Sequence, residues 1–464
     1  MLTDFDGSDG YLPALDSLYD CVGSWTVSPA SSGQGVGLEY EGPGSPATID
    51  SRFCSAFYRP PTSRSNTGRH IKDTRRCRPS LGRSGGKFEG RIALTSRSHL
   101  WGPAGVVPPD VVTSAHTVEY LSEALNLSPR RKQWLDERVQ ASGIQRRHTC
   151  VPEFMDGFRY RTENVSAATS YDQSMYSLEE RMQRYEREAL KLAEGATVSL
   201  LKRTGARLDE ITHVIWVTCT GFAAPGPAQS LADRLGLGDH VHHVQIGFMG
   251  CGAALQGLRL ADAYCASDPD AVVLLLCVEF CTLHFGSTLR SAEQMIIATH
   301  FADGAAAALI SRRQIAPNPS LCLRSFCSLK LQADPGLLTW RLGDGAGFVM
   351  GLGRRLPKVL ADGVERLVAR MPVDDPEEPS SWVIHPGGRA IVETIGEQLG
   401  LTSHDLSPSL ETLAEFGNMS SPTVLFALER YDQAPTQGRL IAFGPGPSIE
   451  GMCWGKPQSG SPPS

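Results

Sequence analysis

The chain has 464 residues, of which 41% are hydrophobic and 20% charged, as in soluble globular proteins large enough for more than one core. A formal net charge of −6 argues against nucleic-acid binding as the main task. Twelve cysteines without a CxxC pair exclude a small disulfide scaffold, favour no metal site and indicate a reducing compartment. The acidic N-terminus lacks signal-peptide features, and the longest apolar run, 271–278, is shorter than the roughly 20 residues that span a bilayer. We therefore expect a cytoplasmic protein that binds no membrane.

Residues 1–90 differ in composition from the rest. They contain no Lys or Arg up to Asp50, and then a basic stretch among Ser, Pro and Gly from Ser51 onward. Little hydrophobic periodicity is present, so we predict a disordered N-terminal extension. A solvated tail is favoured over a segment that contacts RNA or anionic lipid. Residues 457–464 form a second, short Pro/Ser/Gly tail.

From residue 91 the sequence predicts regular structure. One strand and three helices come first: Arg91–Leu100, then Ser114–Leu125, Pro129–Ser142 and Ser177–Thr204. Strands and helices then alternate. The strands are expected at Thr212–Thr218, His242–Phe248, Ala271–Val278 and Ala305–Ser311, and the helices at Gln229–Leu235, Ala253–Ala266 and Ala292–Phe301. The alternation continues with strands at Phe348–Leu352, Trp382–His385 and Arg439–Phe443 and helices at Leu356–Arg370, Ile391–Leu399 and Pro422–Tyr431. Apolar strands alternating with helices predict an α/β fold in which helices cover both faces of mixed sheets.

A cysteine stands between two glycines where an expected strand gives way to an apolar helix. This residue, Cys251, follows Gly250 and precedes Gly252. A sharp strand–turn–helix connection requires glycine, and the helix dipole favours a thiolate at this position. An isolated thiol in an apolar segment is more often a buried structural residue. The glycine turn and the two partners below favour a catalytic nucleophile instead.

A histidine and an asparagine occur in similar positions later in the chain. His385 ends a strand and precedes Pro-Gly-Gly, and Asn418 lies in the segment Gly-Asn-Met-Ser-Ser. Taken alone, each has an ordinary structural reading, as a hydrogen-bonded core histidine and a turn asparagine. Beside a thiol, a neutral imidazole can accept the thiol proton and then hold the thiolate as an ion pair, and a carboxamide can donate to an oxyanion.

These motifs, in this order, resemble the type III polyketide synthases, the chalcone-synthase-like branch of the thiolase superfamily. The segments Phe301-Ala-Asp-Gly and Phe443-Gly-Pro-Gly also match that family, and the resemblance runs from about Gly90 to Trp454. It implies a two-lobed, thiolase-like αβαβα layered fold. The N-terminal lobe would span 91–315 and carry the cysteine, and the C-terminal lobe would span 316–456. The resemblance also implies a homodimer.

The resemblance assigns roles residue by residue. Cys251 would carry the acyl group, His385 would activate it, and His385 with Asn418 would stabilise the enolate formed from malonyl-CoA. Phe301 and Trp340 match the two gatekeepers between the CoA tunnel and the cavity. The expected lining of the substrate pocket is Phe301, Trp340, Cys219, Cys281, His284, Ser420 and Pro445. The substrates would be an acyl-CoA starter and malonyl-CoA, with no metal or redox cofactor.

Several positions depart from the plant enzymes. Cys219 replaces a threonine, as in bacterial and fungal members, while Cys281 and His284 replace small threonines of the cavity. Ala224 stands where a methionine crosses the plant dimer, and Trp340 replaces a phenylalanine. The CoA-tunnel cations do not align cleanly. Candidates are Arg130, Arg131, Lys132 and Arg138, for which a solvated helix face is an equal alternative.

The sequence therefore predicts iterative decarboxylative condensation that ends in a pyrone, resorcinol or polyhydroxyaromatic product. A ketoacyl synthase of the fatty-acid-initiating type shares Cys, His and Asn but is expected to have glutamine after its histidine motif. A papain-like protease has its cysteine near the mature N-terminus. A non-catalytic acyl- or CoA-binding relative is the alternative from another class, and the intact triad argues against it.

Overall fold

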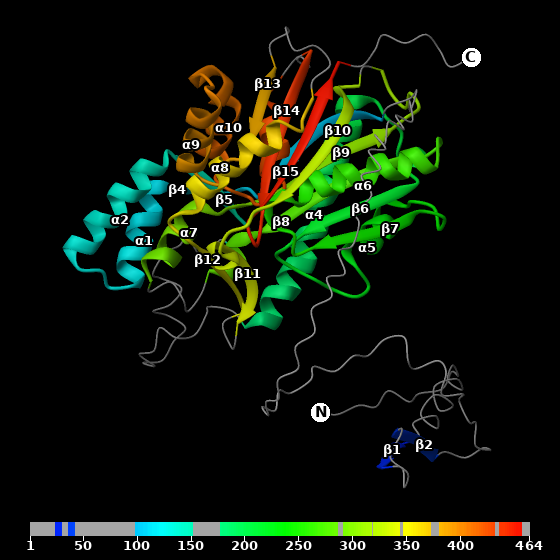
Figure 1. The fold of residues 1–464 in the computed structure, drawn as a ribbon, viewed down its shortest axis with the longest axis horizontal. Helices are drawn as coiled ribbons and strands as arrows, with labels where there is room; N and C mark the ends of the chain where they lie inside the picture. The colour runs from blue at the N-terminus through cyan, green and yellow to red at the C-terminus, as the bar shows by residue number, and fades with distance from the viewer. Residues whose placement is uncertain are drawn as a thin grey trace, which may run out of the picture. The chain divides into compact units, whose positions relative to one another are not determined.

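Two compact units make up the chain, Met1–Glu89 and Gly90–Ser464. A computed structural model describes residues 24–29, 36–41, 98–151, 177–285, 291–317, 319–343, 347–372, 380–431 and 436–456 (Figure 1). In the first unit it describes one antiparallel hairpin, β1 (Ser24–Pro29) with β2 (Val36–Glu41), which the sequence analysis did not predict. The rest of the expected N-terminal extension, the tail 457–464 and residues 91–97 lie outside the described residues.

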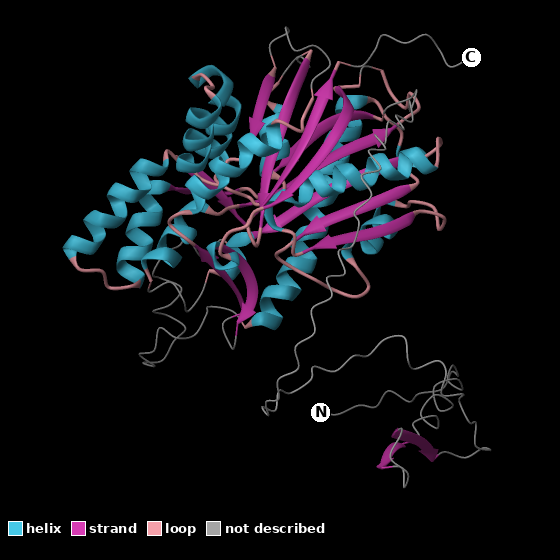
Figure 2. Ribbon diagram, viewed as in Figure 1, coloured by secondary structure: helices cyan, strands magenta, loops and turns pink. Residues whose placement is uncertain are grey.

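A nine-stranded mixed sheet organises the second unit (Figure 2). Its strands are β3 (His99–Val106), β6 (His213–Thr218), β7 (His242–Gly247), β8 (Val272–Phe280), β9 (Asp303–Ser311), β10 (Leu321–Lys330), β13 (Ser381–Ile384), β14 (Gln437–Gly444) and β15 (Ser448–Gly455). Their order is β13-β14-β15-β10-β3-β9-β8-β6-β7. The two halves meet at β10 and β3, where the described residues pair Leu321 with Leu100 and Cys322 with His99.

Helices lie outside and between the two halves of the sheet, which gives the layered arrangement. On one outer face α4 (Leu178–Thr204) and α5 (Pro227–Leu235) pack against β3, β9, β8, β6 and β7. α6 (Ala253–Ser267) and α11 (Thr423–Glu429) form the central layer, whose core includes residues from both halves. On the other outer side lie α8 (Leu356–Val368), α9 (Arg389–Leu399) and α10 (Ser403–Phe416). The predicted thiolase-like α/β fold is confirmed.

Smaller elements close one end of the unit. They are β4 (Asp110–Thr113), β5 (Arg146–Thr149), the hairpin β11 (Leu338–Gly343) with β12 (Gly347–Leu352), and the helices α1 (Ser114–Ala124), α2 (Pro129–Ser142) and α7 (Ala292–His300). A shared apolar core joins α1, α2 and α7. Within the described ranges, no helix has the length and apolar character needed to cross a bilayer.

Local sequence explains the best-predicted elements. α4 begins with a capping box, in which Ser177 and Glu180 bond each other's backbone, and ends at Gly205 in the left-handed conformation. Every residue of β8 and β9 is buried, so these strands carry uninterrupted apolar runs rather than alternation.

The prediction was wrong at β3 and incomplete in the second half. β3 was expected to end at the Gly102-Pro103 turn, but it continues to Val106 because a register shift between Trp101 and Ala104 accommodates both residues. β10, β15 and α10 were not predicted. α10 contains Pro408 in its interior and β15 contains Gly451, which weaken the local signals.

Candidate active site

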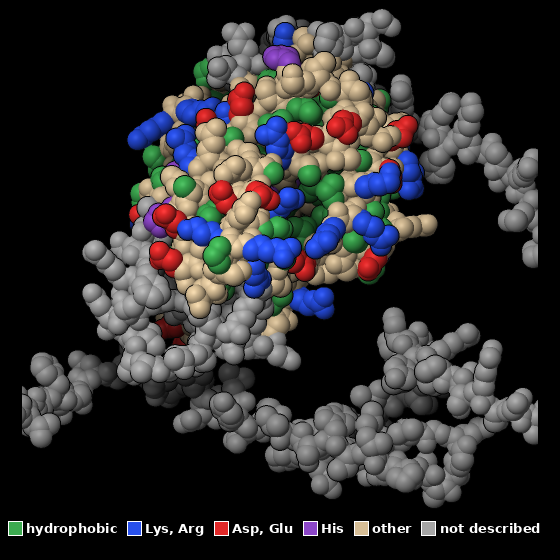
Figure 3. All heavy atoms as spheres, turned by 90° about the vertical axis from the view of Figure 1, so that its left-hand side faces the viewer, with side chains coloured by type: hydrophobic (Ala, Val, Ile, Leu, Met, Phe, Trp, Pro, Cys, Tyr) green, Lys and Arg blue, Asp and Glu red, His purple; other side chains and the backbone are tan. Residues whose placement is uncertain are grey.

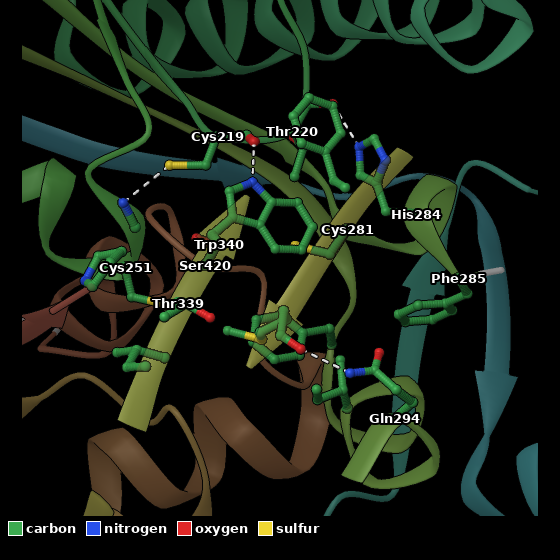
Figure 4. A pocket seen from close by; sticks show the side chains of 17 residues that line it. Cys219, Thr220, Cys251, Cys281, His284, Phe285, Gln294, Thr339, Trp340 and Ser420 are labelled. Atoms are coloured by element: carbon green, nitrogen blue, oxygen red, sulfur yellow. Dashed lines mark hydrogen bonds between the residues drawn. The ribbon is translucent and has the colours of Figure 1, made fainter. Parts of the chain in front are cut away.

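A largely apolar pocket lies next to the turn that carries Cys251 (Figure 4). It contains about 720 Å³ of empty space, including the solvent at its mouth. It is lined by Cys219, Thr220, Gly250, Cys251, Cys281, His284, Phe285, Gln294, Ile297, Phe301, Leu338, Thr339, Trp340, Phe348, Met350, Ser420 and Pro445. Seven residues expected from the sequence to line the substrate pocket therefore lie around one cavity.

The turn that presents Cys251 is shaped by the end of β14. Gly250 has a φ of +67°, and a Cβ at this residue would stand 2.6 Å from Cδ of Pro445. A Cβ at Gly252 would stand 3.3 Å from the carbonyl of Phe443. These close approaches account for the two glycines, because a side chain at Gly250 would both clash and require a disfavoured backbone conformation. The short 3-10 turn Gly250–Gly252 leads directly into α6.

The pKa of the Cys251 thiol is higher than its position at the start of a helix suggests. Burial raises the pKa of this thiol to about 12, hydrogen bonds from Ser420 and Asn418 oppose the rise, and the charge of Glu279 adds to it. The expected depression of the pKa is therefore not found in the empty pocket. A base must take the proton when the sulfur attacks.

His385 is the buried imidazole of this region. Its backbone N–H donates to the carbonyl of Ile441 at 2.8 Å, which fixes the loop after β13 to β14. Its side chain is 1% exposed, and neither ring nitrogen has a hydrogen-bond partner among the described residues. Burial lowers the pKa of His385 to about 3, so the imidazole is neutral in the empty pocket and a weaker base than a solvated histidine.

Asn418 links the histidine loop to the cysteine. Its Nδ2 donates to the carbonyl of Gly387 at 3.2 Å, while its Oδ1 accepts from the backbone N–H of Ser420 at 2.8 Å. One carboxamide N–H is thus held by the histidine loop, and the same side chain stands near enough to Cys251 to lower the pKa of its thiol. Through these contacts three segments distant in the sequence meet at one place.

The Asn418 backbone also fixes Phe301. The two residues form an isolated parallel β-bridge, in which Ala302 N donates to the Asn418 carbonyl and Asn418 N donates to that of His300, both at 2.9 Å. The buried guanidinium of Arg147 donates to the carbonyl of Phe301 at 2.6 Å. The expected gatekeeper is therefore held at its backbone from two sides.

Aromatic rings form one wall of the pocket. Trp340 and Phe348 stack with centroids 5.5 Å apart, and the His284 ring meets both of them edge-on. Trp340 Nε1 donates to the carbonyl of Cys219 at 2.7 Å, and His284 Nε2 donates to that of Thr220 at 2.7 Å (Figure 4). These bonds tie the β11–β12 hairpin to the loop after β6. Phe348 and Gln294 were missed as pocket residues from the sequence, because Phe348 reaches the pocket wall by stacking on Trp340 of β11, which was not predicted, and Gln294 carries no motif within α7.

The expected CoA-binding cations are not part of this pocket. Arg130, Arg131, Lys132 and Arg138 lie on the exposed side of α2, and none of them lines the cavity. Figure 3 views the face on the left of Figure 1, where α1 and α2 lie, and shows Lys and Arg side chains around a hollow floored by hydrophobic ones. The described residues contain no group of three or more His, Cys, Asp and Glu side chains arranged to hold a metal ion.

The layered fold, with its cavity beside a glycine-flanked cysteine at the start of a central helix, defines a thiolase-like protein. Residues 100–313 match the family described as chalcone and stilbene synthases, N-terminal domain, and residues 336–455 match the corresponding C-terminal domain. The chain belongs to the chalcone and stilbene synthase family and is a type III polyketide synthase.

Individual relatives agree with this assignment. The chain is 30% identical over 375 residues to the alpha-pyrone synthesis polyketide synthase-like Pks18 of Mycobacterium tuberculosis, covering 77% of this chain and 91% of that protein. It is 29% identical over 285 residues to the 3,5-dihydroxyphenylacetyl-CoA synthase of Streptomyces toyocaensis, covering 58% and 72% of the two chains. The crystal structure of PKS-I from the brown alga Ectocarpus siliculosus superposes with a TM-score of 0.68 at 25% identity, covering 78% of this chain and 99% of that one.

Proposed function

We propose that the enzyme is an acyltransferase in which Cys251 takes an acyl group from an acyl-CoA starter. His385 accepts the thiol proton, the sulfur attacks the thioester carbonyl, and CoA leaves as its thiol after protonation. The observation that carries this proposal is that the Asn418 carboxamide donates to the Gly387 carbonyl of the His385 loop and also lowers the pKa of the Cys251 thiol, so that it stands at both. The unpartnered ring nitrogens of His385 support its role as the base.

Malonyl-CoA supplies the extender unit. Loss of CO2 leaves an enolate on the thioester, and its oxygen accepts hydrogen bonds from Asn418 and His385. The carbanion carbon then attacks the acyl-cysteine carbonyl, which forms a carbon–carbon bond and releases the Cys251 sulfur. Return of the lengthened chain to the sulfur allows a further round.

The product is a pyrone, a resorcinol or a related polyhydroxyaromatic ring. Cyclisation inside an apolar cavity suits a flexible polyketide, because the walls determine which carbons meet. Two relatives support these ring types by their names, one for alpha-pyrone synthesis and the other for 3,5-dihydroxyphenylacetyl-CoA, which contains a dihydroxylated benzene ring. Trp340, Phe348 and His284 are the wall residues that we assign to folding of the chain.

Shortening the aromatic wall is expected to change the product. Trp340→Phe removes the hydrogen bond to the Cys219 carbonyl and frees space beside the cavity, with a stability cost of about 1 kcal/mol. We expect masses corresponding to additional extensions, measured by liquid chromatography and mass spectrometry. Leu342→Ala, on the same hairpin but 56% exposed and outside the lining, is the matched control. An unchanged product profile in Trp340→Phe would refute the role of this wall.

The phosphates of CoA are proposed to bind near the C-terminal end of α2. Arg389 follows the His385 loop directly, and its Nη1 lies 3.0 Å from where a Cβ of Gly143, the C-cap of α2, would stand. Its guanidinium pairs with Glu393 at 2.8 Å and is about half exposed. Arg138, near the same end of α2, adds to the positive charge that phosphate groups require, whereas Arg130, Arg131 and Lys132 lie in the first turn at the other end of the helix.

Removal of the Arg389 charge should weaken CoA binding. Arg389→Ala is expected to raise KM for acyl-CoA and malonyl-CoA by roughly 3- to 10-fold with little change in kcat, because a partly exposed contact to phosphate contributes about 1 kcal/mol. Lys358→Ala, an exposed lysine of α8 that pairs with Asp362, is the control. A KM equal to that of the wild type would exclude Arg389 from the CoA site.

We also propose that the enzyme is a homodimer. Phe222, Phe248 and Met249 are 47%, 45% and 41% exposed, which is unusual for large apolar side chains placed together. They border β7, the last strand of the sheet, and the Phe222 and Phe248 rings contact Phe348 of the pocket wall. A second copy over this patch would cover both the apolar rings and the free strand edge.

Charge on this patch should separate the subunits. Phe248→Asp is expected to convert a dimer into monomers in light scattering coupled to gel filtration, because a buried carboxylate without a partner opposes association. Val198→Asp, at an exposed apolar residue of α4, is the control and should leave the mass unchanged. A monomeric wild-type protein would disprove the proposal directly.

A non-catalytic acyl- or CoA-binding protein is the second candidate, favoured by one observation. The pKa of Cys251 is raised rather than lowered, as a protein without catalysis would permit. Incubation of the wild-type protein with labelled malonyl-CoA and a panel of acyl-CoA starters distinguishes the two. Labelled pyrones or phenolics, with an acyl adduct on the Cys251 peptide, are expected from the synthase. Absence of both would leave the binding protein as the function.

A further inference from the structure

A buried carboxylate lies behind the pocket and has no part in the mechanism above. Glu279, near the end of β8, is 0% exposed. Its Oε2 accepts hydrogen bonds from the Cys219 backbone N–H at 2.8 Å and from the Thr220 hydroxyl at 2.7 Å, and its Oε1 accepts from the Ser421 hydroxyl at 2.9 Å. Thr218 adds a longer bond of 3.3 Å to Oε2.

These bonds join two segments of the chain that contribute to the lining of the pocket. Cys219 and Thr220 line it on the side of β6, and Cys219 Sγ accepts from the backbone N–H of Gly250 at 3.1 Å. Ser420, next to Ser421, lines it on the side of Asn418 and lowers the pKa of the Cys251 thiol. The same carboxylate therefore holds the turn after β6 and the turn after Asn418, which line the same pocket as Cys251.

The charge of this carboxylate is not neutralised by its hydrogen-bond partners. All four donors named above are neutral groups, and the titratable groups that sense Glu279 are Tyr185 of α4 and the thiols Cys219, Cys251, Cys277 and Cys281. Burial raises the pKa of Glu279 to about 7, and its charge in turn raises the pKa of Cys251. A less acidic thiol is the stronger nucleophile once a base has removed its proton.

We propose that Glu279 is a positioning residue for the condensation, which fixes these two segments of the pocket lining and acts on the sulfur through its charge. The proposal rests on the function proposed above only in its first part, because the electrostatic action on the thiol can be measured without substrates.

Two variants separate the charge from the geometry. Glu279→Gln keeps the shape, since its Oε1 can accept from Cys219 and Thr220 while its Nε2 donates to the Ser421 hydroxyl, but it removes the charge. Glu279→Asp keeps the charge but is one methylene shorter, so it cannot reach both turns. Asp303→Asn is the matched control, because Asp303 is also a fully buried carboxyl whose donors come from Cys150 and Thr282.

The readouts are alkylation of Cys251 by iodoacetamide as a function of pH, followed on its peptide by mass spectrometry, and kcat for product formation. We expect Glu279→Gln to be alkylated about tenfold faster at pH 8, with its profile displaced by about one pH unit to lower values. Asp303→Asn should follow the wild-type profile. Glu279→Asp should keep a profile close to that of the wild type and lose about tenfold in kcat, equal to about 1.4 kcal/mol.

Each result decides one part of the proposal. A Glu279→Gln profile that coincides with the wild type, or an equal displacement in Asp303→Asn, would overturn the electrostatic action. A Glu279→Asp enzyme with unchanged kcat would overturn the positioning role. If the wild type forms no product but Glu279→Gln still shifts the alkylation profile, the proposed synthase function fails while the action of Glu279 on Cys251 stands.

Discussion

Replacement of Cys251 by alanine is expected to lower product formation by about a thousand-fold or more, because the growing chain then has no atom to which it can be esterified. The turn itself should tolerate the change, since its conformation is set by Gly250 and Gly252 against Phe443 and Pro445. Products are measured by mass spectrometry, and the acyl adduct by the intact mass of the protein after incubation with starter. The adduct should disappear together with the product.

A second thiol of the same pocket provides the control. Cys281 lines the cavity and its pKa is also raised by burial, yet it lies on the turn after β8 and not at the start of the central helix α6. Cys281→Ala should retain the adduct and most of the activity, with changes confined to the product profile. Loss of the adduct in Cys281→Ala but not in Cys251→Ala would identify Cys281 as the nucleophile and refute the mechanism.

Short-range signals made the fold class and the site segments predictable. Gly250, Cys251 and Gly252 mark a strand–turn–helix connection by local sterics, and the all-apolar runs of β8 and β9 predict buried strands without knowledge of their neighbours. The matches to family motifs added the pairing of Cys251 with His385 and Asn418. The confirmed fold shows that these local patterns were sufficient to predict the fold class.

Features that depend on long-range contacts were not predictable. The pKa of Cys251 is governed by burial and by Glu279, which is 28 positions away along the chain, so the local helix-dipole argument gave the opposite direction. Glu279 itself looks like an isolated acid at the end of an apolar run, and only the fold reveals its bonds to Cys219, Thr220 and Ser421. The stacked Trp340 and Phe348 come from two strands of a hairpin of which the sequence showed one.

Replacement of Asn418 by aspartate is expected to lower malonyl-CoA decarboxylation by about 10² to 10³, the usual effect of losing one oxyanion donor. Aspartate retains an oxygen that accepts from the Ser420 backbone N–H, so the turn and its bridge to Phe301 should persist. It lacks the N–H groups that contact the Gly387 carbonyl and the sulfur, and its negative charge repels an enolate. Release of labelled CO2 from carboxyl-labelled malonyl-CoA measures the step.

Acylation of Cys251 should suffer much less in this variant, which separates the two steps. In the proposed mechanism His385 removes the proton from the thiol, and its backbone bond to Ile441 does not involve Asn418. We therefore expect a starter adduct on Cys251 in Asn418→Asp at a rate within about tenfold of the wild type, while His385→Ala should lose both the adduct and decarboxylation. If Asn418→Asp decarboxylates malonyl-CoA normally, its carboxamide is a structural link between loops and the enolate must be held by other donors. If the variant loses the adduct instead, Asn418 is required for acylation of Cys251, and the roles assigned to His385 in acylation and to Asn418 in decarboxylation have to be exchanged.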